Sequence, residues 1–254
     1  MYKNVDILGI NISSVTIHEA IENIKKYIKY GNKNYKVYTP NTDFIVRSVK
    51  DIKFKNILNN SDLNIADGMP LVWMSRLLGA PIKEKVAGSD LVFKLCKTAS
   101  IEGYTIFLLG SLNNIALKAK KRLEAFYPQI KIVGAFSPSF GFDKNDSELK
   151  EIIKMINKSE PDILFVGLGS PKQEFFISKY SSEYKAKVSI GVGASIDFAA
   201  GVKKMPPQFL KKLGFAWLWR LCEEPKRLWR RYLIDDMKFF YYILLQKFSK
   251  RFYK

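Results

Sequence analysis

The chain has 254 residues, of which 47% are hydrophobic and 26% are charged. This length suits one large α/β domain or one domain plus an appendage, and the composition argues against an intrinsically disordered protein. The formal charge of +18 at pH 7 favours an anionic partner, such as a nucleic acid, an anionic membrane or a phosphate-bearing substrate.

The sequence lacks the usual signs of export or membrane insertion. Cys96 and Cys222 are its only cysteines and lie far apart, which disfavours a disulfide framework. Residues 1–9 do not have the basic start and apolar core of a signal peptide, and no stretch reaches the roughly 18 apolar residues of a transmembrane helix. We therefore expect a cytoplasmic protein whose contact with a membrane is peripheral.

Helical and strand patterns alternate along residues 1–201. Thr16 and Glu19 form a capping box, and an apolar stripe at helical spacing follows as far as Ile28. Short apolar runs bounded by turn or cap residues then occur at residues 35–38, 63–66, 105–109, 131–133, 163–166 and 188–190. This alternation predicts an α/β fold with a Rossmann-like wound, mostly parallel sheet and helices on both faces.

The composition changes after about residue 201. Residues 202–254 contain 14 Lys/Arg against four Asp/Glu, a net charge of +10, and three of the four tryptophans. Pro225, preceded by two glutamates, marks the start of a new helix. Apolar residues then recur every three or four positions, at Trp229, Leu233, Met237, Phe240, Leu244, Phe248 and Phe252. We therefore divide the chain into a core, 1–201, and a basic helical appendage, 202–254.

A basic amphipathic helix with aromatic residues is typical of an interfacial membrane anchor. The adjacent aromatic residues 239–242 exceed one narrow packing stripe, so we expect residues 226–254 to face an anionic membrane surface. The alternative is a helix that packs on the core with its charges in solvent. Binding of nucleic acid is disfavoured because no nucleic-acid motif accompanies the charge.

The loops after the predicted strands are the candidate site, because wound parallel sheets bind ligands beyond the carboxyl ends of their strands. Thr39 and Asn41 follow the run 35–38 and offer hydrogen-bonding groups, although this segment can also simply begin a helix. Asp67 follows the run 63–66, where its carboxylate can accept the proton of an attacking hydroxyl or merely cap a helix.

Three later loops are rich in glycine, which lets backbone N–H groups approach a phosphate at a helix N-terminus. The last of them also carries a carboxylate that can hold a ribose. None matches the P-loop pattern, and the chain has no GxGxxG fingerprint, so binding of NAD is weakly supported. The candidate nucleotide-binding residues are Gly110, Gly167, Gly169, Gly191, Gly193 and Asp197.

No residue pattern indicates a metal site. The single histidine, His18, lies in the first helix and is interpreted as structural, and no Asp-x-Asp follows an apolar strand. A metal-bridged diphosphate is therefore disfavoured, and Lys and Arg would have to neutralise a departing diphosphate. We expect neither a metal nor a cofactor.

At these motifs the sequence resembles the WecG/TagA/CpsF glycosyltransferase family (glycosyltransferase family 26) from about Val5 to Leu233. The resemblance rests on residues 39–41, 66–68, 84–88, 167–174, 191–197, 217–220 and 224–231. It implies a metal-independent, inverting enzyme that uses a UDP-sugar and polyprenyl-diphosphate-linked GlcNAc. It further implies that Asp67 is the general base and that Thr39, Asn41 and Gln173 line the active site.

The resemblance also implies a role for the appendage, whose Arg220, Arg227 and Arg230 match family arginines and would close over the site at the membrane. Two positions depart from the family pattern. Lys85 stands where Arg is common, and the two residues differ in bidentate phosphate binding. Ala216 stands where Glu is usual.

The resemblance favours transfer of an N-acetylmannosamine-type sugar from UDP to lipid-linked GlcNAc at the inner face of the cytoplasmic membrane, in teichoic acid or surface polysaccharide synthesis, although the family motifs do not encode the sugar. Lys85 and the three appendage arginines would stabilise the diphosphate. Transfer of N-acetylmannosaminuronic acid or glucose by the same mechanism is an alternative, and a non-catalytic membrane-binding adaptor is another. A homo-oligomer is compatible with each of these functions.

Overall fold

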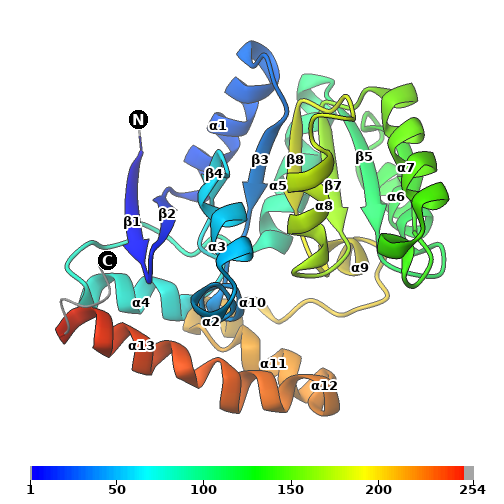
Figure 1. Cartoon of the computed structure of the whole chain (residues 1–254). Coiled ribbons are helices and arrows are strands. Elements are labelled where there is room, and N and C mark those ends of the chain that lie inside the picture. The colour runs from blue at the N-terminus through cyan, green and yellow to red at the C-terminus, as the bar shows by residue number, and fades with distance from the viewer. Residues whose placement is uncertain (1, 249–254) are drawn as a thin grey trace.

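A computed structural model describes residues 2–248, and a six-stranded parallel sheet forms the centre of its core (Figure 1). The strand order across the sheet is β4-β3-β8-β7-β5-β6. The strands are β3 (Tyr35–Tyr38), β4 (Leu63–Asn64), β5 (Thr105–Gly110), β6 (Lys131–Phe136), β7 (Ile163–Gly167) and β8 (Val188–Gly191). Each of the six apolar runs therefore contains a strand, and the predicted α/β wound sheet is confirmed.

Helices cover both faces of the sheet because successive strand residues point to opposite sides. In β7, Ile163 and Phe165 pack in one buried cluster, and Leu164 and Val166 pack in the other. The first cluster is covered by α1 (Ile17–Tyr30), α5 (Gly88–Glu102), α6 (Ile115–Phe126) and α9 (Ser195–Ala199). The second is covered by α2 (Thr42–Lys50), α3 (Ile52–Asn59), α4 (Met69–Leu77), α7 (Asp146–Ser159) and α8 (Lys172–Tyr180). A short 3₁₀ turn, η1 (Phe142–Lys144), precedes α7.

The capping box predicted for α1 is confirmed. The backbone N–H of Glu19 donates to Oγ1 of Thr16 over 3.2 Å, and the Glu19 carboxylate accepts from the Thr16 N–H over 2.8 Å. These reciprocal bonds satisfy two backbone donors that the first turn of a helix otherwise leaves without partners.

An antiparallel hairpin of β1 (Lys3–Ile7) and β2 (Ile10–Ser14) precedes α1 and was not predicted. Its two-residue turn holds Leu8 at φ 53° and Gly9 at φ 79°. Two-residue hairpin turns with positive φ at both positions usually contain Asn-Gly. Leucine at the first position departs from this pattern, so the sequence does not indicate the turn. The hairpin matters for the site because its turn contacts the last described helix, where the Leu8 N–H donates to the side-chain oxygen of Gln246 over 3.0 Å.

The appendage runs beneath the carboxyl ends of the strands, along the lower edge of the molecule in Figure 1. It comprises α10 (Gln208–Leu213), α11 (Ala216–Glu223), α12 (Pro225–Arg230), a π-helical turn η2 (Arg231–Asp235) and α13 (Met237–Phe248). The helix start predicted at Pro225 is confirmed. Within residues 2–248, no helix is both long and apolar enough to cross a membrane.

One face of α13 packs on the core, and the predicted apolar stripe lies mostly outside that face. Phe239, Ile243 and Gln246 are buried. Five residues of the stripe are exposed, namely Trp229, Leu233, Met237, Leu244 and Phe248. Phe240 is partly buried, and Phe252 lies outside the described residues. The appendage therefore both packs on the core and presents an apolar surface to its surroundings.

Candidate active site

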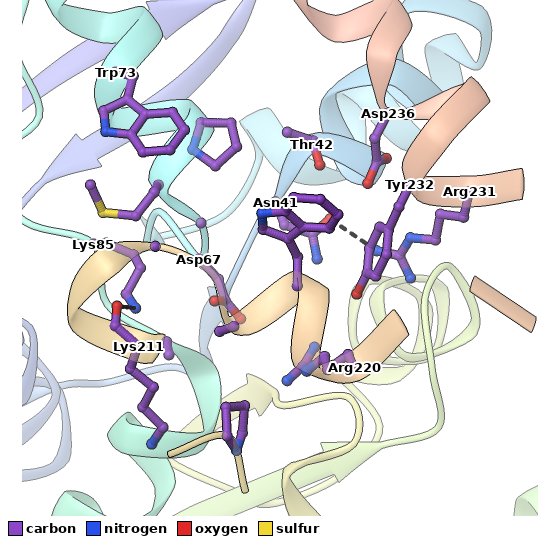
Figure 2. Close-up of a pocket in the computed structure, with 18 of the residues that line it drawn as sticks. Asn41, Thr42, Asp67, Trp73, Lys85, Lys211, Arg220, Arg231, Tyr232 and Asp236 are labelled. Carbon is purple, nitrogen blue, oxygen red and sulfur yellow. Dashed lines mark hydrogen bonds between the residues drawn. The ribbon is translucent and has the colours of Figure 1, made fainter. Parts of the chain in front are cut away.

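Two adjoining cavities lie between the carboxyl ends of the strands and the appendage. The larger, of about 800 Å³, is bordered by the loops after β3, β5, β7 and β8 and by α11 and α12. The smaller, of about 390 Å³, lies among α4, α10, α11 and the segment from η2 to α13 (Figure 2). The residues that line both cavities are Asn41, Asp67, Ser89, Arg220, Arg231 and Tyr232.

Asp67 lies at the junction of the two cavities, just beyond the end of β4. Its Oδ2 accepts a hydrogen bond of 3.2 Å from the N–H of Gly88, the first residue of α5. Burial raises the pKa of Asp67, and the positive charges of Arg220 and Lys85, together with the bond from Gly88, partly oppose this shift. The site thus contains a carboxylate that is more basic than usual and open to both cavities.

The smaller cavity has mostly apolar walls. α4 contributes Met69, Pro70 and Trp73, and the appendage contributes Trp217 and Phe240 among others. Such a surface suits the apolar part of a ligand or the face of a sugar ring.

Lys85 lines the smaller cavity and not the larger one. Its Nζ donates to the backbone carbonyl of Lys211 over 3.3 Å, and Lys211 in turn pairs with Asp90 over 2.6 Å. Figure 2 shows Lys85 and Lys211 on one side of Asp67 and Arg220 on the other. Lys85 is thereby separated from the glycine-rich loops that border the larger cavity.

The glycine-rich loops line the larger cavity only in part. Gly167, Gly169 and Gly193 are at its surface, and a Cβ added at Gly169 or Gly193 would meet nothing within 4 Å. Gly110 and Gly191, which the sequence assigned to the nucleotide, are not among its lining residues in the described chain.

These two glycines lie where other parts of the chain approach closely, namely the Gly167 backbone at Gly110 and the Gln173 and Glu174 side chains at Gly191. A Cβ at Gly110 would lie 2.4 Å from the carbonyl oxygen of Gly167, and one at Gly191 would lie 3.0 Å from Nε2 of Gln173. The carbonyl of Gly191 also accepts from the Thr39 hydroxyl over 3.1 Å. Their position indicates that they hold the loops in place.

Gln173 anchors the loop after β8. Its side-chain oxygen accepts from the Gly193 N–H over 3.0 Å, and its Nε2 donates to Oε1 of Glu174 over 2.6 Å. Glu174 is fully buried, and this burial raises its pKa to about 7. Gln173 was predicted to line the active site, and it does line the larger cavity.

Asp197 lies in the same cavity and joins the core to the appendage. The hydroxyl of Ser111 donates to its Oδ1 over 2.6 Å. Lys203 lies 3.5 Å from its Oδ2 and 2.8 Å from the carboxylate of Glu224. Ser111 was not singled out from the sequence, although it directly follows Gly110 in a predicted loop.

The three predicted appendage arginines do not come together. Arg220 lines both cavities, and its guanidinium lies 5.4 Å from the ring centre of Phe198. Arg227 lines the larger cavity and pairs with Glu224. Arg230 is exposed and lines neither cavity.

Arg231 occupies the position that Arg230 was expected to take. It lines both cavities, and its guanidinium donates to Oδ1 of Asn41 over 3.4 Å. It lies 3.7 Å from the carboxylate of Asp43. Its spacing of four residues from Arg227 is compatible with a shared helix face, as is the spacing of three for Arg230, so the sequence pattern does not distinguish the two.

The sequence matches a known family over almost its whole length. A family model described as the glycosyl transferase WecG/TagA/CpsF family matches residues 5–253. The chain belongs to this family. It is similar to proteins of Staphylococcus aureus strains MRSA252, MW2 and NCTC 8325, with 31%, 30% and 30% identity over 227 residues, 89% of this chain and 87% of each relative. These relatives are named N-acetylglucosaminyldiphosphoundecaprenol N-acetyl-beta-D-mannosaminyltransferases.

For a glycosyltransferase of the WecG/TagA/CpsF family, the two cavities offer separate places for two substrates. A carboxylate between them can take a proton from an acceptor hydroxyl in one cavity as that hydroxyl attacks a sugar held in the other. No group of three or more His, Cys, Asp or Glu in the described part of the chain is arranged to hold a metal ion. The cationic side chains at the cavities are Lys85, Lys203, Lys204, Lys211 and Arg47, Arg220, Arg227, Arg231.

Proposed function

We propose that the protein transfers N-acetylmannosamine from UDP to GlcNAc linked to a polyprenyl diphosphate, with inversion at the anomeric carbon. The observation that carries this proposal is that Asp67 borders both a polar, glycine-lined cavity and an apolar one. A nucleotide-sugar suits the first cavity, and a lipid-linked sugar suits the second. The names of the relatives support this choice of acceptor and transferred sugar.

The donor would bind in the larger cavity. Gly169 and Gly193 have positive φ and open space around them, so backbone groups there are accessible to a phosphate. Asp197 is available to a ribose, although it already accepts from Ser111. Arg220 and Arg227 would neutralise the diphosphate of UDP as it leaves.

In the proposed reaction, ionised Asp67 removes the proton from an acceptor hydroxyl. The hydroxyl oxygen forms a bond to the anomeric carbon while the bond from that carbon to UDP breaks on the opposite face. UDP leaves with the bonding electrons, and the cations described above stabilise its charge. We propose that no metal takes part, so that transfer continues in excess EDTA. An absolute requirement for magnesium or manganese would contradict this assignment of leaving-group stabilisation.

The exposed stripe of the appendage supports a location at the membrane. Leu233 and Met237 border the smaller cavity and are also exposed, so the apolar cavity and the apolar surface are continuous. We propose that this surface docks on the anionic inner face of the cytoplasmic membrane, where the acceptor resides. The part of the proposed docking segment at residues 249–254 lies outside the described residues.

A panel assay tests the proposed function. Purified protein would be given polyprenyl-diphosphate-GlcNAc with UDP-N-acetylmannosamine, UDP-N-acetylmannosaminuronic acid or UDP-glucose, and release of UDP would be measured. The expected result is release with the first donor and a product whose anomeric configuration is inverted. Release of UDP only with another donor would show that a different sugar is transferred, and the proposed mechanism would still apply. UDP binding without turnover on any donor would contradict the proposed catalysis.

A further inference from the structure

Arg231 lies at the end of α12, where the helix changes its geometry. The N–H of Asp236 donates to the carbonyl of Arg231 over 2.7 Å, the five-residue spacing of a π-turn. Arg231 follows Arg227 by four residues, so both side chains lie on the face that borders the larger cavity. The exposed Arg230 lies off this face. The helix therefore presents two cations to the cavities from one side.

The guanidinium of Arg231 is incompletely paired. Its bond to Asn41 is long at 3.4 Å, and Asp43, 3.7 Å away, also pairs with Arg47 over 3.3 Å. Among the described residues, its buried Nε has no hydrogen-bond partner. An arginine held only for structure is expected to have its buried donors satisfied, because an unpaired buried donor is costly.

Part of this side chain remains available to a ligand. Its exposed fraction is 32%, and it lines both cavities beside Asp67 and Arg220. Figure 2 shows Arg231 beside Asn41 and Tyr232, on the opposite side of the pocket from Lys85, with Asp67 between the two. A planar guanidinium with free N–H groups suits bidentate binding of a phosphate oxygen pair.

We propose that Arg231 binds a substrate diphosphate at the junction of the two cavities. The inference rests on the proposed function, in which both substrates carry this group: UDP on the donor side and the polyprenyl diphosphate on the acceptor side. The shared ligand chemistry is a diphosphate. Arg231 lines both cavities, so either diphosphate can reach it. Binding measurements with a separate probe for each diphosphate distinguish the two.

The test measures binding without requiring turnover. Titration calorimetry on the full chain would use UDP as one probe and farnesyl diphosphate as the other, with wild-type protein, Arg231→Gln and Arg231→Lys. Loss of a charge-assisted contact is expected to weaken at least one probe by about tenfold or more in Arg231→Gln. If only the affinity for UDP falls, Arg231 binds the diphosphate of the donor. If only the affinity for farnesyl diphosphate falls, Arg231 binds the diphosphate of the acceptor. Arg231→Lys keeps the positive charge but loses the paired N–H donors of the guanidinium. Its affinity for the probe should therefore lie between those of wild type and Arg231→Gln.

Three comparisons separate ligand binding from a structural role. Lys226→Gln removes an exposed charge of α12 outside both cavities and should bind both probes as wild type does. Asp43→Asn removes the ionic partner of Arg231 and should retain binding better than Arg231→Gln. The loss in Arg231→Gln should also exceed that in Arg230→Gln.

The inference is overturned if Arg231→Gln binds both probes within about twofold of wild type, or if Asp43→Asn weakens binding equally. Unfolding by heat and circular dichroism would show that each variant is folded. Failure of the proposed function is a separate outcome, because it would appear as absence of sugar transfer by wild-type protein whose diphosphate binding still depends on Arg231.

Discussion

The backbone N–H of Gly88 points at the carboxylate of Asp67 and donates to its Oδ2 over 3.2 Å. Gly88 begins a helix of 15 residues, whose amino end favours a negative charge. A Cβ added at Gly88 would lie 3.4 Å from Oγ1 of Thr39 and 3.6 Å from Oδ2 of Asp67. The helix, the threonine and the proposed base therefore meet at one point, and this contact orients the carboxylate.

Asp67→Asn removes the proton acceptor and keeps the size of the side chain. We expect turnover to fall by about 10²–10⁴, because general-base catalysis contributes a factor of this size. UDP binding should change little, since the proposed nucleotide contacts lie on other loops. Turnover measured by UDP release, together with calorimetry, tests both parts. Near-normal turnover would remove Asp67 from the mechanism.

The pH dependence of kcat/KM should report the ionisation of Asp67. Burial raises its pKa above the ordinary value, and a general base works only when ionised, so activity should rise with pH through that raised pKa. Arg220 lowers this pKa, so Arg220→Gln should move the acid limb to higher pH. Asp90 raises it, so Asp90→Asn should move the limb to lower pH. Shifts in the same direction for both variants would contradict the assignment of this limb to Asp67.

Glu174→Gln should stabilise the fold at high pH. Burial raises the pKa of Glu174 from 4.5 to about 7, so the folded state binds more protons than the unfolded state between these values. Wild-type stability is therefore lost as pH rises from 4.5 to 7, by up to about 3 kcal/mol, and glutamine removes this loss. Denaturant unfolding at pH 5 and pH 8 would measure it. An equal effect of the substitution at both pH values would show that the charge is not responsible.

Leu244→Ser with Phe248→Ser should weaken binding to membranes without unfolding the protein. Both side chains are exposed, by 47% and 79%, and neither lines a described cavity. Loss of two apolar side chains from a docked surface should reduce binding to anionic vesicles about tenfold or more, as measured by co-sedimentation. Phe239→Ser is the contrasting variant, because Phe239 is buried in the core and its loss should lower the melting temperature. Unchanged vesicle binding by the double variant would contradict docking through this face.

The strands and the loops that follow them could be predicted because their signal is local. Short apolar runs such as residues 163–166 reveal strands, and the parallel arrangement then brings their carboxyl ends to one edge. This reasoning placed Asp67 and Gln173 at the cavities. It could not separate glycines that line the cavity from Gly110 and Gly191, since that depends on which backbone and side-chain atoms approach each glycine in the folded chain.

The appendage arginines show a second limit of sequence patterns. On a helix, positions three and four residues after Arg227 both fall near its face, so spacing alone could not choose Arg231 over Arg230. The π-turn that follows α12 has no clear signature in the sequence. The buried face of α13 was also hidden, because apolar residues occur around much of that helix and only tertiary packing selects Phe239 and Ile243 for the core.

Gln246 joins two parts of the protein that are synthesised far apart in time. Its side chain accepts from the N–H of Leu8 over 3.0 Å and donates to the carboxylate of Asp6 over 2.9 Å, across 238 residues from the first and 240 from the second. Contacts of such long sequence separation form late, because closing the intervening loop costs entropy that only the assembled native contacts offset. The hairpin turn must therefore wait for α13 to leave the ribosome before its Leu8 amide finds this partner. Residues of η2 and α13 line part of the smaller cavity, so in a nascent chain that cavity closes after the loops beyond β3, β5, β7 and β8 have been made.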